Sequence, residues 1–201
     1  EGKGTMWEGG ARVPCIMRWP KTIKANQTNN KIAATIDIYP TIAHIVSQKE
    51  FKDKIDGVSL MPILQGIPSA EPRNELYYYY GKELIAVRKG KWKLVFPHVY
   101  RSYEGVEPGK NLYPGPYGRG RSGLELYDLI NDVGERVDLA KIHPDIVLDL
   151  EKLGEKARSI LGDKLTDRVG RESYDVICGF DPQVEKIENL AVGKNIILEN
   201  N

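Results

Sequence analysis

The sequence predicts a mixed α/β (α+β) fold in which a small antiparallel four-stranded sheet packs on a C-terminal helix. From residue 73 onward, segments rich in aromatic and β-branched residues alternate with short Gly/Lys turns, which is typical of an antiparallel meander. Residues 143–162 then repeat apolar side chains at helical spacing, with Pro144 suited to the first turn and Gly162 to the C-terminal cap. Neither element buries its apolar side alone, so we expect the helix to cover the sheet.

Three segments that precede the sheet also carry structural signals. Residues 12–19, RVPCIMRW, predict a strand that is buried for much of its length. Residues 33–48 place isoleucine and valine at nearly helical spacing and predict a helix that begins near Tyr39. Residues 56–66, DGVSLMPILQG, predict a short helical turn that closes on Gly66.

Within the predicted sheet, the strand signals differ in kind. Ile85–Val87 and Lys91–Phe96 flank RKGK and predict a β-hairpin. The tyrosine run 77–80 should alternate between the two faces of a strand and serve packing. Residues 101–121 are rich in glycine and proline, and this composition predicts a long surface loop.

Composition excludes several classes of partner. The 201 residues include 29 Lys and Arg against 28 Asp and Glu, so no overall field favours nucleic acid or an anionic membrane. No apolar run approaches the roughly 18 to 20 residues that a spanning helix needs. Cys15 stands in an apolar run, which predicts a buried free thiol, and a disulfide with Cys178 stays open. No Cys/His spacing indicates zinc, so we predict no metal site in this chain.

The first residues, EGKGTMWEGGARVP, hold Lys3 between two glycines. Such a loop brings backbone groups and one positive charge close to a small anion. The alternative is a solvated loop lysine beside a glycine-rich turn. Glu8 is expected to stabilise the turn, or to orient Lys3 or Arg12 through an ion pair.

Five motifs occur along the chain in a fixed order: GKGTMWEGGARVP, DIYPTIAHI, DGVSLMPILQG, AVRKGKWKLV and LELYDLINDVGERVDLA. Together they cover residues 1 to about 165, and they resemble the C-terminal half of type I sulfatases, the arylsulfatase family of the alkaline-phosphatase-like superfamily. The resemblance implies that residues 1–72 form the end of the catalytic α/β core and residues 73–165 an antiparallel subdomain. Residues 166–201 form a tail that resembles the start of an appended β-sandwich.

The resemblance also implies roles for single residues. In this family the lysine of the GKGT segment binds the sulfate group, so Lys3 is the expected catalytic and substrate-binding residue. An ammonium is a compact charge that can neutralise a sulfuryl oxygen. His98 ends a strand and opens the long loop, where it is expected to contact substrate. Structural roles are expected for His44, Asp37, Asp56 and Asp128.

The family's nucleophile is a formylglycine made from a C/S-x-P-x-R motif, and this chain has no such motif: Cys15 is followed by Ile-Met-Arg. The family's calcium ligands precede the GKGT segment. The resemblance therefore implies a C-terminal fragment that is inactive alone, with calcium and formylglycine in the missing N-terminal half. Its first portion should expose apolar surface and favour non-native oligomers.

The implied substrate is a sulfate ester of a carbohydrate or an aryl group, without nucleic acid or membrane partners. Family habit implies a periplasmic or secreted enzyme of bacterial glycan degradation. One alternative is a non-catalytic module that binds sulfated glycan or a protein partner on the same scaffold. A phosphate-ester hydrolase of the same superfamily is disfavoured, because the three histidines have no acidic partner in a metal-ligand arrangement.

Overall fold

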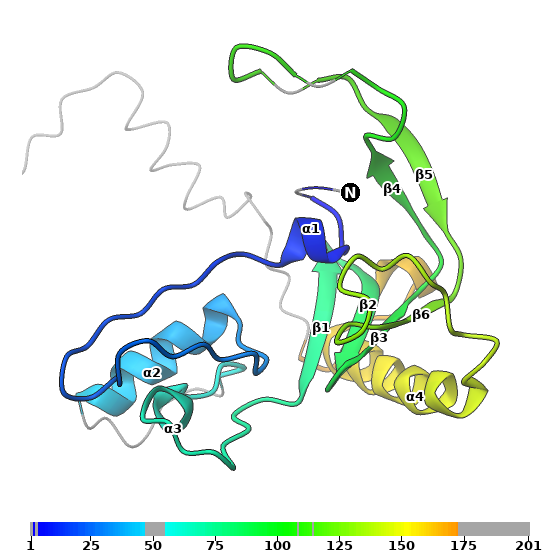
Figure 1. Ribbon diagram of the computed structural model, residues 1–201. Coiled ribbons are helices and arrows are strands. Elements are labelled where there is room, and N and C mark those ends of the chain that lie inside the picture. The colour runs from blue at the N-terminus through cyan, green and yellow to red at the C-terminus, as the bar shows by residue number, and fades with distance from the viewer. Residues whose placement is uncertain (1, 3, 47–54, 108, 114, 173–201) are drawn as a thin grey trace, which may run out of the picture.

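The computed structural model describes residues 2, 4–46, 55–107, 109–113 and 115–172 (Figure 1). Its α-helices are α1 (Glu8–Ala11), α2 (Ile38–Ile45), α3 (Met61–Leu64) and α4 (Pro144–Leu161), and its 3-10 helices are η1 (Thr35–Asp37) and η2 (Lys164–Thr166). Its strands are β1 (Glu75–Tyr80), β2 (Glu83–Lys89), β3 (Trp92–Val95), β4 (His98–Ser102), β5 (Gly118–Ser122) and β6 (Glu125–Asp128).

The predicted four-stranded sheet is confirmed, with strand order β1-β2-β3-β6 and antiparallel pairing throughout. The predicted hairpin corresponds to β2 and β3. A β-bulge interrupts the β1–β2 ladder, because Tyr78 pairs with Ala86 while the next residue, Tyr79, pairs with Leu84. The extra residue is Ile85, so Ile85 and Ala86 both pack on one side of the sheet.

Helix α4 covers one face of the sheet, as the sequence predicts (Figure 1). It begins at Pro144 and ends before Gly162, whose φ of 84° suits glycine. The helix approaches the sheet closely, since a Cβ on Gly154 would lie 2.5 Å from Cζ of Phe96. The apolar core between helix and sheet comprises Leu84, Val87, Leu94, Phe96, Leu126, Val147, Leu150, Leu153 and Ala157.

The opposite face of the sheet is covered by the segment that follows the N-terminus. Met6 is buried there, and Trp7 packs against the same cluster of Ile85, Ala86, Val95, Tyr127 and Leu129. The tyrosine run alternates as predicted, because Tyr77 and Tyr79 pack on the α4 side while Tyr78 packs on the other. The sheet is therefore buried on both faces.

Strands β4 and β5 form a separate two-stranded arm that extends away from the sheet and α4 (Figure 1). The prediction of a surface loop over residues 101–121 is therefore wrong at both ends. The two strands pair through their backbones although β5, GRGRS, is rich in arginine and glycine. A side chain at position 120 would displace the ring of Tyr100, because a Cβ there would lie 2.4 Å from Cζ of Tyr100.

Residues 12–19 form no strand, and the side chain of Cys15 is exposed, so both predictions for this segment are wrong. Its apolar residues favour an extended chain, but no described segment pairs with it. The predicted helix near Tyr39 is confirmed as α2, and the predicted helical turn as α3. The predicted start of a β-sandwich, and Cys178, lie outside the described residues.

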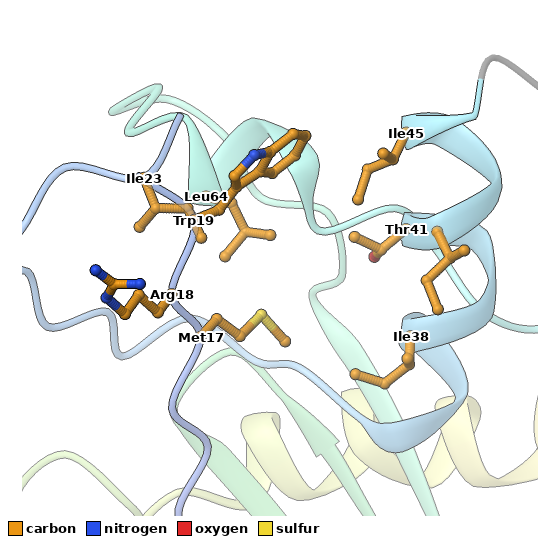
Figure 2. Close-up of a pocket in the computed structure, with 9 residues that line it drawn as sticks. Met17, Arg18, Trp19, Ile23, Ile38, Thr41, Ile45 and Leu64 are labelled. Carbon is orange, nitrogen blue, oxygen red and sulfur yellow. The ribbon is translucent and has the colours of Figure 1, made fainter. Parts of the chain in front are cut away.

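The portion before the sheet exposes apolar side chains, in agreement with the sequence-based expectation. Ile38, Ile42 and Ile45 of α2 are all exposed. They line one side of a pocket of about 380 Å³, and Met17 and Trp19 line the other (Figure 2). Within the described ranges, no helix combines the length and apolar character needed to cross a membrane.

Candidate functional site

Glycines flank Lys3 on both sides, and a third glycine, Gly10, packs against the carbonyl of Gly2. Lys3 itself lies outside the described residues, but Gly2 and Gly4 on either side are described. Gly4 has a φ of 91°, and the hydroxyl of Thr5 donates to the carbonyl of Gly2 at 2.8 Å. A Cβ on Gly10 would lie 2.4 Å from that same carbonyl, so the EGG turn fits beneath the loop only with glycine there.

Lys93 of β3 holds the segment that contains Met6 and Glu8 against the sheet. Its side chain is 0% exposed, and its ammonium donates to the carbonyl of Met6 at 2.5 Å. It also forms ion pairs with Oε1 of Glu135 at 2.7 Å and with Oε1 of Glu8 at 3.3 Å. The backbone N–H of Glu8 donates to Oε2 of Glu135 at 2.6 Å, which closes the cluster.

The buried cluster of Glu8, Lys93 and Glu135 joins three parts of the chain: the N-terminal segment, β3 and the turn after β6. The cluster also contacts Tyr78, because the ammonium of Lys93 lies 4.5 Å from the centre of the Tyr78 ring. Burial, and secondarily the negative charge of Glu8, raise the pKa of Tyr78 to about 12. Opposite charges in a dry interior interact strongly, so the cluster holds residues 6 and 8 in place.

The sequence alone does not identify Lys93 and Glu135 as site residues. For Glu8 it predicts, as one alternative, an ion pair with Arg12 but not the one with Lys93. Glu8 does approach Arg12, at 3.7 Å, but its buried partner is Lys93. A signal was present, because Lys93 stands between Trp92 and Leu94 in a predicted strand. Leu94 faces the helix, so Lys93 must face the opposite side of the sheet. If that side is also buried, the charge of Lys93 requires a carboxylate partner.

A small pocket of about 50 Å³ lies where the N-terminal loop meets the root of the arm. Gly4 and Thr5 form one part of its wall, and residues 98–101 of β4 form another. Tyr80, Glu83 and Ile85 complete it. The structure thus brings His98, one of the two predicted site residues, beside the described neighbours of Lys3.

His98 is 6% exposed and has a fixed orientation. Its Nδ1 lies 2.7 Å from the carbonyl of Phe96 and 2.8 Å from the hydroxyl of Ser122. Because a carbonyl only accepts hydrogen bonds, Nδ1 carries a proton, and in the neutral ring Nε2 is left with a lone pair.

Two buried nitrogens at this junction have no hydrogen-bond partner in the described part of the chain: Nε2 of His98 and Nε1 of Trp7. The ring of Tyr100 lies between these residues, 5.9 Å from His98 and 5.8 Å from Trp7. Buried polar groups normally find partners, and His98 lines the small pocket, so its unpartnered Nε2 marks a candidate binding site.

The described residues contain no group of three or more His, Cys, Asp or Glu side chains arranged to hold a metal ion. They therefore do not fit the calcium site that the family implies. Asp37 pairs with Arg73 at 2.5 Å, and Asp128 pairs with Lys91 at 2.6 Å. Each of the two carboxylates is thus paired with a cation of the same chain, and Nδ1 of His44 lies 3.0 Å from the hydroxyl of Ser59.

The larger pocket beside α2 lacks comparable chemistry. Arg18 is its only charged lining residue, and the rest of its wall is apolar apart from Thr41 (Figure 2). It shares no residue with the small pocket at the loop–arm junction. The junction is therefore the better candidate for binding a polar ligand.

Two family models match this chain. Residues 2–107 match the family described as N-sulphoglucosamine sulphohydrolase, C-terminal, and residues 71–176 match the C-terminal region of aryl-sulfatase. Steryl-sulfatase from Mus musculus is 32% identical over 145 residues, covering 67% of this chain and 23% of that protein. Arylsulfatase A from Homo sapiens is 30% identical over 161 residues, covering 76% of this chain and 31% of that protein.

The fold is also found in a solved sulfatase. The crystal structure of PsFucS1 sulfatase from Pseudoalteromonas sp. matches with a TM-score of 0.61 at 23% identity, covering 77% of this chain and 31% of that one. This match shows the fold, which is alkaline-phosphatase-like. The chain spans 23% of the mouse relative and 31% of the human one. It belongs to the sulfatase family and corresponds to the family's C-terminal region.

Proposed function

We propose that this chain acts in a sulfuric ester hydrolase, where it supplies Lys3 and His98 to the site that binds the sulfate ester. The family match supports the reaction class. The observation that carries the proposal is the small pocket at the junction, because its wall combines Gly4 and Thr5 with His98.

Lys3 would hold the oxygens of the sulfate group. An ammonium at that position offsets negative charge that grows on the sulfuryl oxygens as the ester bond breaks. This effect requires a donor that is already in position before the reaction. The buried cluster of Glu8, Lys93 and Glu135 would provide that preorganisation for the loop.

His98 would contact the alcohol portion of the substrate. Its Nδ1 proton is engaged by the carbonyl of Phe96, so its Nε2 lone pair is suited to accept a hydrogen bond from a substrate hydroxyl. This role favours a sulfated carbohydrate, which carries free hydroxyls. The description of one matching family, N-sulphoglucosamine sulphohydrolase, supports the same substrate class, with aryl sulfates as the second candidate.

The nucleophile and the metal would come from elsewhere in the enzyme. We assign formylglycine and calcium, which the family resemblance implies, to a sulfatase N-terminal region that acts together with this chain. The chain alone is then expected to be inactive. A periplasmic or secreted role in bacterial glycan degradation belongs to the same proposal.

The test is hydrolysis of 4-nitrophenyl sulfate by this chain alone, and by the chain joined to a sulfatase N-terminal region matured with a formylglycine-generating enzyme. The proposal predicts turnover only for the combination. A folded, calcium-loaded combination that fails to hydrolyse any of several sulfate esters would favour the binding-module alternative. Activity of the chain alone would show that the nucleophile lies within these residues.

A further inference from the structure

Three arginines lie on one face of the β4–β5 arm. The strand register places Arg101 directly opposite Arg119, and Arg121 opposite Val99. Because side chains two residues apart share a face of a strand, all four point to the same side. All four are exposed. We call Arg101, Arg119 and Arg121 the arginine face.

The arginine face makes no ion pair within the described residues, although Glu83 lines the same small pocket as Arg101. Like charges in directly opposite positions repel each other, so the Arg101–Arg119 pair is unfavourable unless an anion lies between them. No carboxylate of the described residues forms an ion pair with any of the three arginines. The guanidinium of Arg101 contacts aromatic groups instead, 4.4 Å from the ring of Tyr117 and 3.4 Å from the hydroxyl of Tyr103.

The other face of the arm holds it in place. His98, Ser102 and Ser122 are buried on that side, and the ring of Tyr100 packs edge-on against Trp7 at 5.8 Å. The arm is thus fixed through contacts that do not use the arginines. Its exposed face is left available for a ligand.

The arginine face begins at the candidate site. Val99 and Arg101 line the small pocket together with Gly4 and Thr5, and Arg119 and Arg121 stand beside them on β5. The arm then continues outward from the sheet (Figure 1). A ligand anchored at the loop would meet this row of positive charge as it leaves the pocket.

We propose that the arginine face binds additional sulfate groups of an extended polyanionic oligosaccharide whose scissile sulfate lies at Lys3. This inference rests on the proposed function and extends it to the substrate class. Guanidinium groups present planar pairs of donors that suit oxyanions, and adjacent arginines suit a ligand that carries repeated sulfates. A sulfate placed between Arg101 and Arg119 would also relieve their mutual repulsion.

The test is binding of this chain to a fluorescent chondroitin 6-sulfate hexasaccharide, to the unsulfated hexasaccharide and to an oligonucleotide of matched charge. The substituted protein is the triple variant R101Q/R119Q/R121Q. A matched control, R18Q/K141Q/R171Q, removes the same charge from exposed positions elsewhere. Circular dichroism verifies folding, and the single variants R119Q and R121Q replace the triple variant if it does not fold.

The proposal predicts that the sulfated hexasaccharide binds most tightly and that the triple variant weakens this binding about tenfold, with a much smaller loss in the control. It predicts that each single variant causes about a twofold loss. Equal losses in triple variant and control, equal binding of both hexasaccharides, or preferred binding of the oligonucleotide would each overturn it.

This measurement needs no turnover, so it separates the two proposals. If the sulfated hexasaccharide binds through the arginines but the combined enzyme hydrolyses no sulfate ester, the proposal for the arginine face stands and the proposed catalytic function is rejected. If the combined enzyme hydrolyses sulfate esters but the arginine substitutions do not change binding of the hexasaccharide, only the proposal for the arginine face is rejected.

Discussion

The ammonium of Lys93 lies 2.7 Å from a carboxylate oxygen of Glu135, and their side chains are 0% and 3% exposed. The same ammonium bonds the carbonyl of Met6, so a residue in the middle of the sheet fixes the segment that follows the GKGT loop. Charges buried this completely are stable only while every partner is present. This relationship makes the loop's position depend on the C-terminal sheet.

Replacing Lys93 with methionine should destabilise the fold strongly. The substitution leaves Glu135 buried without a cation and Glu8 with only the exposed Arg12 at 3.7 Å. Removing one partner of a buried ion pair typically costs about 3 to 5 kcal/mol. The measurement is urea unfolding followed by circular dichroism.

The control for this experiment is Lys89→Met. Lys89 also forms an ion pair at 2.7 Å, with Asp149, but its side chain is 41% exposed. Its loss should destabilise the fold much less, because both charged groups of this pair are exposed and solvent screens their attraction. Similar costs for the two variants would show that Lys93 is not held by a buried cluster.

Asp37 should make the fold sensitive to acid. Burial favours its protonated form, but hydrogen bonds from Arg73 and from the backbone N–H groups of Val58 and Ala34 outweigh burial and hold the pKa of Asp37 below 3.8. The unfolded carboxyl therefore takes up a proton first as pH falls. The stability it contributes is fully present above about pH 4 and is lost as pH falls through the folded pKa.

The variant Asp37→Asn should therefore show a weaker dependence of unfolding free energy on pH below about pH 4. The slope for one proton is at most about 1.4 kcal/mol per pH unit. Asp145→Asn, at an exposed position on α4, serves as the control and should retain the wild-type slope. An unchanged slope for Asp37→Asn would show that this carboxyl does not depend on its partners.

His98 should be fixed as the tautomer with the proton on Nδ1. The carbonyl of Phe96, 2.7 Å away, accepts that proton, and Nε2 then shows the chemical shift of an unprotonated imidazole nitrogen. Long-range ¹H–¹⁵N correlation spectra of labelled protein measure both nitrogens. A proton on Nε2 instead would remove the basis for its role as a hydrogen-bond acceptor.

Gly154→Ala tests the packing of α4. Alanine favours helices over glycine by about 1 kcal/mol, so the substitution would stabilise an isolated helix. Here the new methyl group would lie 2.5 Å from Cζ of Phe96, and such overpacking costs about 1 to 3 kcal/mol. We expect a net loss in thermal stability. Gly123→Ala, whose nearest contact would be 3.8 Å, should have little effect.

The sequence predicts those elements whose stability comes from their own pattern. Helix α4 has a complete apolar stripe with Pro144 and Gly162 at its ends, and the β2–β3 hairpin has the Gly90-Lys91 turn between two predicted strands. Residues 12–19 have the propensity of a strand but no described partner, and propensity alone does not supply a ladder. The arm is the reverse case: β5 pairs with β4 through backbone hydrogen bonds, although its Arg/Gly-rich sequence has no strand propensity.

The residues of the candidate site also differ in whether a local sequence pattern identifies them. Lys3 is predicted from its motif. His98 is predicted as the end of a strand that opens a loop, whereas the structure places it at the start of β4, and the roles of both residues stay predictions. Lys93 and Glu135 are missed because their pairing joins two segments that only the folded chain brings together. The loop–arm pocket likewise depends on tertiary structure, because no local pattern places residues 4 and 5 beside β4.

The central claim is that this chain contributes a sulfate-binding lysine to a sulfatase. The most direct test is the kcat for 4-nitrophenyl sulfate of the combined enzyme with Lys3→Ala, compared with Lys24→Ala at an exposed position as a control. The claim predicts a loss of about 100- to 1000-fold for Lys3→Ala and wild-type activity for Lys24→Ala. Wild-type activity in the folded Lys3→Ala enzyme would contradict it.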